Sequence, residues 1–237
     1  MQPFWIALQF LSSLPVRLPG MPTPQDMGRS VLWYPVVGLL FAAVLWGADS
    51  ALQGSPVLLH AALLLLVWVL LTGGLHLDGL ADSADAWLGG YGDRERTLHI
   101  MKDPRSGPIA VVTLVVVLLL KFCALVALVQ LGSMAWLLIP MLGRAALLGL
   151  FLGTPYVRAG GLGQALAEHL PRRAGGWVLA GSLVLGLLLG WKAWVLGLVA
   201  FLWLRHLMLR RLGGTTGDTA GALLELLEVV LLVAVAL

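Results

Sequence analysis

Long apolar runs recur along this chain, and they constrain its fold more than any other feature. Hydrophobic residues make up 59% of the 237 residues and charged residues only 11%, against about 25% in a soluble domain. Because a lipid-exposed backbone must satisfy its own hydrogen bonds, we expect an all-α, polytopic transmembrane helical bundle, a single domain over 1–237. The runs predict seven spans, at 31–50, 57–75, 109–131, 134–152, 177–190, 193–209 and 219–237.

Two segments depart from the usual length of a span. Phe4 to Leu14 gives about eleven residues before Pro15, short of the ~20 that cross a bilayer, so we expect a short interfacial or half-inserted helix there. Its flanks lack a basic region and a small-residue cleavage site, which argues against a cleaved signal peptide. The stretch 177–209 is too long for one span, and we place a break at Gly190-Trp191-Lys192.

Basic residues are distributed unevenly among the predicted loops. Of the fifteen Lys and Arg residues, twelve lie before residue 31 or within 76–108, 153–176 and 205–218. The short loops between the other span ends carry Lys192 alone. Cytoplasmic loops are enriched in Lys and Arg, so we expect the basic segments to share the cytoplasmic face of the membrane. The net charge of +3 then follows from topology, and we expect the lipid bilayer and no nucleic acid as a partner.

Three aspartates follow the second apolar run, in the segment GGLHLDGLADSAD at 73–85. Asp78, Asp82 and Asp85 stand at i, i+4 and i+7, so they share one helical face within roughly 60° if the second span continues as a helix past Gly79. Three ionised carboxylates on one partly buried stripe would repel one another. We therefore predict that all three bind divalent cations, Mg²⁺ above all; the alternative is a solvated helix end.

A second acidic element lies in GGTTGDTAGALLELLE, at 213–228. Asp218 and Glu225 share a helical face, whereas Glu228 is turned away from it. Ionisable groups in a membrane span are costly and rarely face lipid. We expect Asp218 and Glu225 to join the aspartates as metal ligands, and the alternative is an acid paired with an arginine of the bundle such as Arg144.

Several cations are candidates for binding a phosphate. Lys102 and Arg105 of MKDPRSGP and Arg158 of YVRAGGLG are expected on the same face as the aspartates, where they would clamp an anionic substrate. The alternative for each is a topological signal alone. Arg144 interrupts the fourth span and is expected either to bind substrate or to form an internal ion pair. Lys121, in the third span, is expected to be structural.

Metals, carboxylates and cationic clamps together indicate a phosphoryl-transfer site. His76 lies two residues before Asp78, on the opposite helical face, and is expected to pack or to support the site rather than to bind metal. The sequence contains no GxxxxGK[ST] loop and no serine–histidine–acid arrangement that would indicate a different chemistry.

The chain resembles the cobalamin synthase, or adenosylcobinamide-GDP ribazoletransferase, family. The segments that carry this resemblance span nearly the whole chain, in the order GGLHLDGLADSAD, MKDPRSG, Gly143-Arg144, YVRAGGLG and GGTTGDTAGALLEL. The resemblance implies a multi-pass enzyme of the bacterial inner membrane with its active site at the cytoplasmic face. It implies that adenosylcobinamide-GDP and α-ribazole, or α-ribazole 5′-phosphate, react with Mg²⁺ to give adenosylcobalamin, or its 5′-phosphate, and GMP.

The expected site residues follow from the residue spacing and the family resemblance together. Asp82 or Asp85 would take the proton of the ribazole hydroxyl, and Arg105 would assist catalysis as well as bind substrate. Gly214 and Asp218, in the GGTTGDTAG motif, would contact substrate. The resemblance is compatible with an oligomer and with association with other enzymes of the cobalamin pathway.

Two other functions remain in view. A CDP-alcohol phosphotransferase shares the Asp-Gly-x-x-Ala pattern, but its motif continues with Arg where this chain has Asp82. An ion-coupled transporter would use Asp78, Asp82 and Glu225 as cation ligands. Such transporters place their sites near the membrane midplane and often contain internal repeats, and this sequence shows no repeat.

Overall fold

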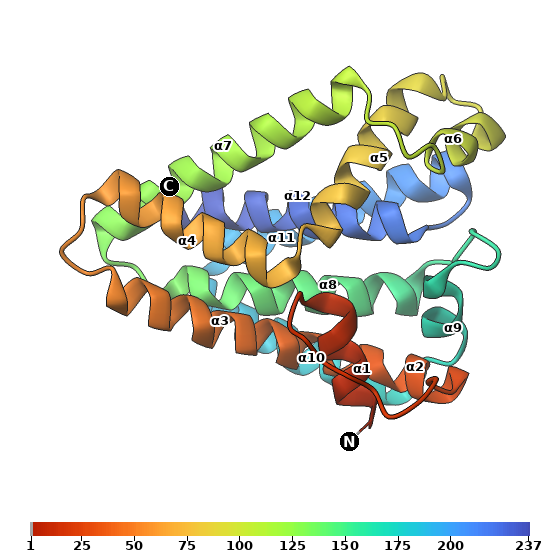
Figure 1. Cartoon of the computed structure of the whole chain (residues 1–237), viewed down its shortest axis with the longest axis horizontal. Coiled ribbons are helices and arrows are strands. Elements are labelled where there is room, and N and C mark those ends of the chain that lie inside the picture. The colour runs from red at the N-terminus through yellow and green to blue at the C-terminus, as the bar shows by residue number, and fades with distance from the viewer. Residues whose placement is uncertain (1) are drawn as a thin grey trace.

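The computed structural model describes residues 2–237, whose regular elements are helices apart from one isolated bridge. The long helices run side by side in an elongated bundle (Figure 1). The α-helices are α1 (Gln2–Leu11), α2 (Pro24–Ser30), α3 (Tyr34–Ala51), α4 (Val57–Thr72), α5 (Leu75–Gly89), α6 (Arg94–Ile100), α7 (Pro108–Leu131), α8 (Ile139–Gly153), α9 (Leu162–Glu168), α10 (Arg172–Gly186), α11 (Trp191–Leu212) and α12 (Gly217–Ala236). The 3₁₀ turns are η1 (Val31–Trp33), η2 (Ala135–Leu138) and η3 (Leu187–Leu189).

The number of spans agrees with the prediction. Among the described residues, six helical segments are long and apolar enough to cross a membrane, and the bent pair α4–α5 raises the number to seven. The predicted break in 177–209 is confirmed, because η3 ends at Leu189 and α11 begins at Trp191. Gly190, between them, has φ of +90°, a backbone conformation that favours glycine. The chain is therefore an all-α, multi-pass membrane protein.

The second predicted span ends earlier than the sequence indicates. Helix α4 stops at Thr72, and α5 begins at Leu75 at 87° to it. Gly73 and Gly74 both have positive φ, +61° and +73°, which ends a helix in the left-handed region. The expectation that one helix continues from 57 past Gly79 is wrong. The three aspartates therefore lie beyond the bend, in a helix that leaves the direction of α4.

The short N-terminal helix is confirmed, although it covers 2–11 rather than 4–14. It packs against α2 and α3 and buries Leu8 and Leu11. After it, the Ser13 backbone N–H donates to the Leu71 carbonyl at 2.9 Å, and the Ser13 hydroxyl donates to the Leu70 carbonyl. These bonds satisfy carbonyls at the end of α4, so the N-terminal segment supports the bend that redirects α5.

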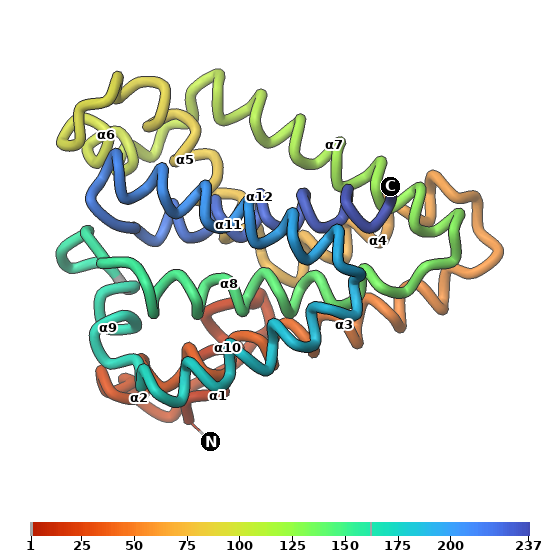
Figure 2. Tube along the Cα trace, turned by 180° about the vertical axis from the view of Figure 1, so that it is seen from behind, coloured from red at the N-terminus to blue at the C-terminus, as the bar shows by residue number. Residues whose placement is uncertain are grey.

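The two ends of the bundle differ. Helices α2, α5, α6 and α9 gather at one end in both views, together with the turn between α11 and α12 (Figures 1 and 2). The connections α3–α4, α7–α8 and α10–α11 lie at the other end. We call the first of these the aspartate end, because α5 and the start of α12 lie there. Helices α8 and α12 occupy the centre, whereas α7 and α11 present mostly exposed apolar faces.

Candidate active site

Helices α5 and α12 cross at the aspartate end with their backbones in close contact. A Cβ placed on Gly79 would lie 2.8 Å from the Asp218 carbonyl oxygen, and one on Gly221 would lie 3.3 Å from the His76 backbone. Real Cβ contacts at 2.8 Å are essentially never seen, so Gly79 is required for this approach. The crossing places Asp78 and Asp82 of α5 beside Asp218, the second residue of α12.

The aspartates influence one another electrostatically. Partial burial, followed by the negative charges of Asp78 and Asp218, raises the pKa of Asp82 to about 6, with a smaller contribution from Asp85. The positive charge of Arg158 acts in the opposite direction. Neighbouring negative charges repel the ionised form of a carboxylate, and this repulsion raises its pKa. Asp78, Asp82 and Asp218 therefore lie near enough to one another for their charges to interact.

Arg158 is held against Asp218 by the loop before α9. Its Nη1 donates to Asp218 Oδ2 at 2.7 Å, and both side chains are partly exposed. Two backbone bonds fix this loop, from the Val157 N–H to the Thr215 carbonyl at 2.9 Å and from the Thr215 N–H to the Pro155 carbonyl at 2.8 Å. The structure therefore brings Arg158 to the carboxylates, as a substrate-binding role would require.

Gly214 has a packing role in this arrangement. A Cβ on Gly214 would lie 2.3 Å from the Pro155 carbonyl oxygen, which no side chain could tolerate. The residue therefore lets the turn before α12 press against the 155–158 loop. The structure thus gives Gly214 a role in positioning Arg158, and its expected contact with substrate stays a prediction.

The side chains at the crossing supply the kind of ligand atoms that a hard divalent cation prefers. Mg²⁺ prefers oxygen ligands, in particular carboxylates, and Asp78, Asp82 and Asp218 supply them. Within residues 2–237, no three His, Cys, Asp or Glu side chains already converge at ligand distance. Asp218 would have to exchange its bond to Arg158 for a metal, and the repulsion around Asp82 would fall when a cation binds.

Asp85 has a different role from its neighbours on α5. Its Oδ2 accepts from the Gly107 N–H, and its Oδ1 accepts from the Ala110 N–H at 3.0 Å. These are free N–H groups in the first turn of α7, so Asp85 caps that helix from another helix. In this structure both oxygens of Asp85 turn toward α7, and the metal or proton-accepting role expected from its spacing stays a prediction.

The expected clamp formed by Lys102 and Arg105 is not assembled. Both side chains are exposed on the loop before α7. Arg105 Nε and Nη2 donate to the two carboxylate oxygens of Asp103, at 3.0 and 2.9 Å. Hydrogen bonds from Arg105 lower the pKa of Asp103 to about 2. The local pairing turns Arg105 toward its own loop, so the catalytic and substrate-binding roles proposed for it gain no support from this arrangement.

Arg144 and Glu225 belong to a buried ion network at the centre of the bundle. Lys121 Nζ donates to Glu225 Oε2 at 2.5 Å and to Glu228 Oε2 at 2.8 Å. Arg144 donates to the other carboxylate oxygen of Glu228. The expectations that Glu225 binds metal and that Arg144 binds substrate are wrong in this structure, and the alternative of an internal ion pair holds instead. Two cations and two carboxylates balance, as buried charges require.

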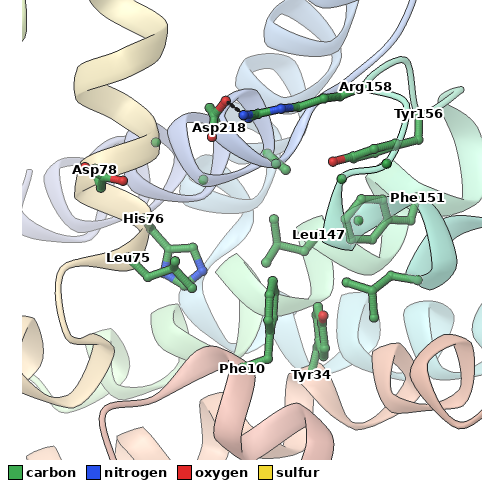
Figure 3. A pocket seen from close by; sticks show the side chains of 18 of the residues that line it. Phe10, Tyr34, Leu75, His76, Asp78, Leu147, Phe151, Tyr156, Arg158 and Asp218 are labelled. Atoms are coloured by element: carbon green, nitrogen blue, oxygen red, sulfur yellow. Dashed lines mark hydrogen bonds and ion pairs between the residues drawn. The ribbon is translucent and has the colours of Figure 1, made fainter. Parts of the chain in front are cut away.

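A cavity of about 410 Å³ opens beside the crossing (Figure 3). Asp78, Asp218 and Arg158 lie at one side of it. The opposite side is formed by Phe10, Tyr34 and Phe151, which come from α1, α3 and α8. Sequence reasoning missed these aromatic residues, because nothing in an apolar run distinguishes a cavity wall from a packed core. His76, expected to pack or support, also lines this cavity.

Comparison with known proteins identifies the family of the chain. A family model described as cobalamin-5-phosphate synthase matches residues 3–236. A protein of Pseudomonas entomophila (strain L48) is 72% identical over 242 residues, covering 100% of this chain and 99% of that protein. One of Pseudomonas fluorescens (strain Pf0-1) is 71% identical and covered in full by this chain. Both are named adenosylcobinamide-GDP ribazoletransferase. No solved structure gives a significant match. The chain belongs to the cobalamin-5-phosphate synthase family.

Proposed function

We propose that the chain is an adenosylcobinamide-GDP ribazoletransferase whose chemistry takes place where α5 crosses α12. Relatives of this name match the chain over its full length. The observation that carries the location is the gathering of Asp78, Asp82 and Asp218 beside Arg158, next to a cavity of about 410 Å³. Carboxylates and a cation at such an opening suit the transfer of a charged phosphoryl group.

The reaction joins two substrates and releases GMP. A hydroxyl oxygen of α-ribazole, or of its 5′-phosphate, attacks the phosphorus on the cobinamide side of the diphosphate. The new P–O bond replaces the P–O bond to GMP, which leaves. The hydroxyl proton needs an acceptor, and we assign this role to Asp82, because both carboxylate oxygens of Asp85 already accept from backbone N–H groups at the start of α7. The products are adenosylcobalamin, or its 5′-phosphate, and GMP.

The remaining groups bind and orient the diphosphate. The Arg158 guanidinium can exchange its bond to Asp218 for one to a phosphate oxygen, since it is partly exposed at the cavity. Mg²⁺, held by Asp78, Asp82 and Asp218, would neutralise the diphosphate charge. Asp85 and Gly214 support these residues through the start of α7 and the 155–158 loop.

We infer the position of the site in the membrane from the distribution of basic residues. Several basic residues lie at the aspartate end, in α6 or at the ends of α10 and α11 that reach it: Arg94, Arg96, Arg172 and Arg211. Basic residues favour the cytoplasmic side. We therefore place the active site at the cytoplasmic face of the bacterial inner membrane. Substrates would enter from the aqueous side, as their charged phosphates require.

A product assay with purified full-length protein tests this function. The protein, in lipid nanodiscs, is incubated with adenosylcobinamide-GDP, α-ribazole and Mg²⁺, and the nucleotide and corrinoid products are identified by mass spectrometry. We expect GMP and the joined corrinoid in equal amounts. GMP formed equally well without α-ribazole would indicate a hydrolase, and folded protein that forms no product would exclude the function. Omitting Mg²⁺ separately tests the metal requirement.

A further inference from the structure

The cavity beside the crossing has an unusual combination of walls. Phe10, Phe151 and Leu147 give it an apolar interior, and the Phe10 ring stacks on the Tyr34 ring with centroids 6.4 Å apart. Its charged residues, Asp78, Arg158 and Asp218, come from α5, the 156–161 loop and α12 (Figure 3). A ligand there would have one apolar, flat end among the aromatic rings and one anionic or hydroxyl-bearing end near Asp78 and Arg158.

Two buried polar atoms in this cavity lack partners. The Tyr34 side chain is 0% exposed, and its hydroxyl forms no hydrogen bond with any described residue. Figure 3 shows this hydroxyl directed into the cavity, toward Leu147. The Nδ1 of His76, which is 4% exposed, is likewise without a partner in the part of the chain that the structure describes. An unsatisfied buried hydroxyl is costly, so the Tyr34 hydroxyl is poised to bond to a ligand.

The number of polar groups on each part of the two substrates limits which part fits in this apolar cavity. Guanine carries donors and acceptors on several edges, and most of them would be left without partners between Phe10, Phe151 and Leu147. A corrin carries many amide side chains and meets the same objection. The base of α-ribazole is a flat benzimidazole with two aromatic faces and one unsubstituted ring nitrogen, which accepts a single hydrogen bond.

We propose that this cavity is the α-ribazole base subsite, and that the Tyr34 hydroxyl donates a hydrogen bond to the unsubstituted ring nitrogen of the base. The base then lies among Phe10, Leu147 and Phe151, and the ribose points toward Asp78 and Asp218. This arrangement delivers the ribose hydroxyl to the carboxylates where the phosphoryl group is transferred. Tyr34 thus acts in substrate specificity, and the inference rests on the proposed ribazoletransferase function.

The first test compares Tyr34→Phe with Tyr91→Phe, a matched control at an exposed tyrosine outside the cavity. Binding of α-ribazole is measured by calorimetry on full-length protein, and KM and kcat are measured for both substrates. We expect Tyr34→Phe to weaken α-ribazole binding and raise its KM about 3- to 10-fold, with little change in kcat or in the KM for adenosylcobinamide-GDP. Unchanged α-ribazole binding, or an effect on adenosylcobinamide-GDP instead, would overturn the assignment.

A second test replaces the ring nitrogen instead of the tyrosine. An α-ribosyl indole analogue, in which C–H replaces the unsubstituted nitrogen, is expected to bind wild-type protein more weakly than the ribazole does. Tyr34→Phe should bind both compounds with similar affinity, since the bond is already absent. A variant that still discriminates fully would contradict the proposed bond. Wild-type protein that binds α-ribazole in this way without forming GMP would refute the transferase function and leave the subsite standing.

Discussion

Gly79 and Asp218 meet backbone to backbone, with space of only 2.8 Å between a Cβ built on Gly79 and the Asp218 carbonyl oxygen. These residues lie 139 positions apart in the sequence (218 minus 79). Their contact joins the two acidic motifs of the chain into one site. The metal and phosphate chemistry proposed for the aspartates depends on this closeness.

Gly79→Ala is therefore expected to damage the site through its geometry. The added methyl would force α5 and α12 apart, at a cost of about 1–3 kcal/mol of stability, and kcat should fall by at least about tenfold. Gly176→Ala on α10 is the matched control, because a Cβ there meets nothing within 4 Å and alanine favours a helix. Thermal unfolding and GMP release are measured for both; an active Gly79→Ala protein would show that the close crossing is dispensable.

The buried ion network offers a test of charge balance. Lys121→Met leaves Glu225 and Glu228 facing Arg144 alone, and breaking a buried pair costs about 3–5 kcal/mol. The double variant Lys121→Met/Glu225→Gln removes one charge of each sign and should be more stable than the single variant. Unfolding in a fixed detergent measures this difference. Losses that simply add in the double variant would mean that these residues are not coupled.

Substitution of Asp85 should affect stability but not Mg²⁺ dependence, unlike substitution of Asp82. Asp85→Ala removes the cap of α7 and is expected to cost about 0.5–2 kcal/mol, while the Mg²⁺ concentration that gives half-maximal rate stays the same. Asp85→Asn keeps a carbonyl oxygen that can accept from the Ala110 N–H, so most of the stability should return. A shift in Mg²⁺ dependence in Asp85→Asn would instead assign Asp85 to the metal site.

The raised pKa of Asp82 predicts a pH dependence for stabilisation by Mg²⁺. Its folded-state pKa of about 6 exceeds the ordinary value of 3.8, so the metal-free folded protein holds an extra proton between these values. Its stability therefore falls as pH rises through this window. A cation offsets the repulsion once Asp82 is ionised, so Mg²⁺ should raise the unfolding temperature more at about pH 8 than at about pH 5. In Asp82→Asn, this difference should shrink; an equal Mg²⁺ effect at both pH values in the wild type would contradict the repulsion.

The sequence predicted the spans well because hydrophobic run length is a local property. The break at Gly190 was also visible, since it interrupts such a run. The turn at Gly73 and Gly74 was not predicted, because a glycine pair is tolerated within a helix unless tertiary contacts, here from Ser13, favour the left-handed conformation.

Helical spacing alone could not assign the acidic residues to their roles. Asp78, Asp82 and Asp85 share one face of α5, yet Asp85 turns to α7 because the free N–H groups of Gly107 and Ala110 are near. Glu225 shares a face with Asp218 along α12, but it lies about two turns further along the helix, where it meets Lys121. The periodicity of one helix does not show which neighbour each position will face.

The most direct measurement of the central claim is the rate of GMP release as a function of Mg²⁺ concentration, for wild-type protein and Asp82→Asn. Asp26→Asn, on α2 and not among the residues that line the cavity, is the control for the loss of one carboxylate. We predict a saturable Mg²⁺ dependence in the wild type and in Asp26→Asn, and a loss of turnover of at least about 100-fold in Asp82→Asn, with the variant still folded and inserted. Near-normal turnover and Mg²⁺ dependence in Asp82→Asn would contradict the assignment of the active site to the crossing of α5 and α12.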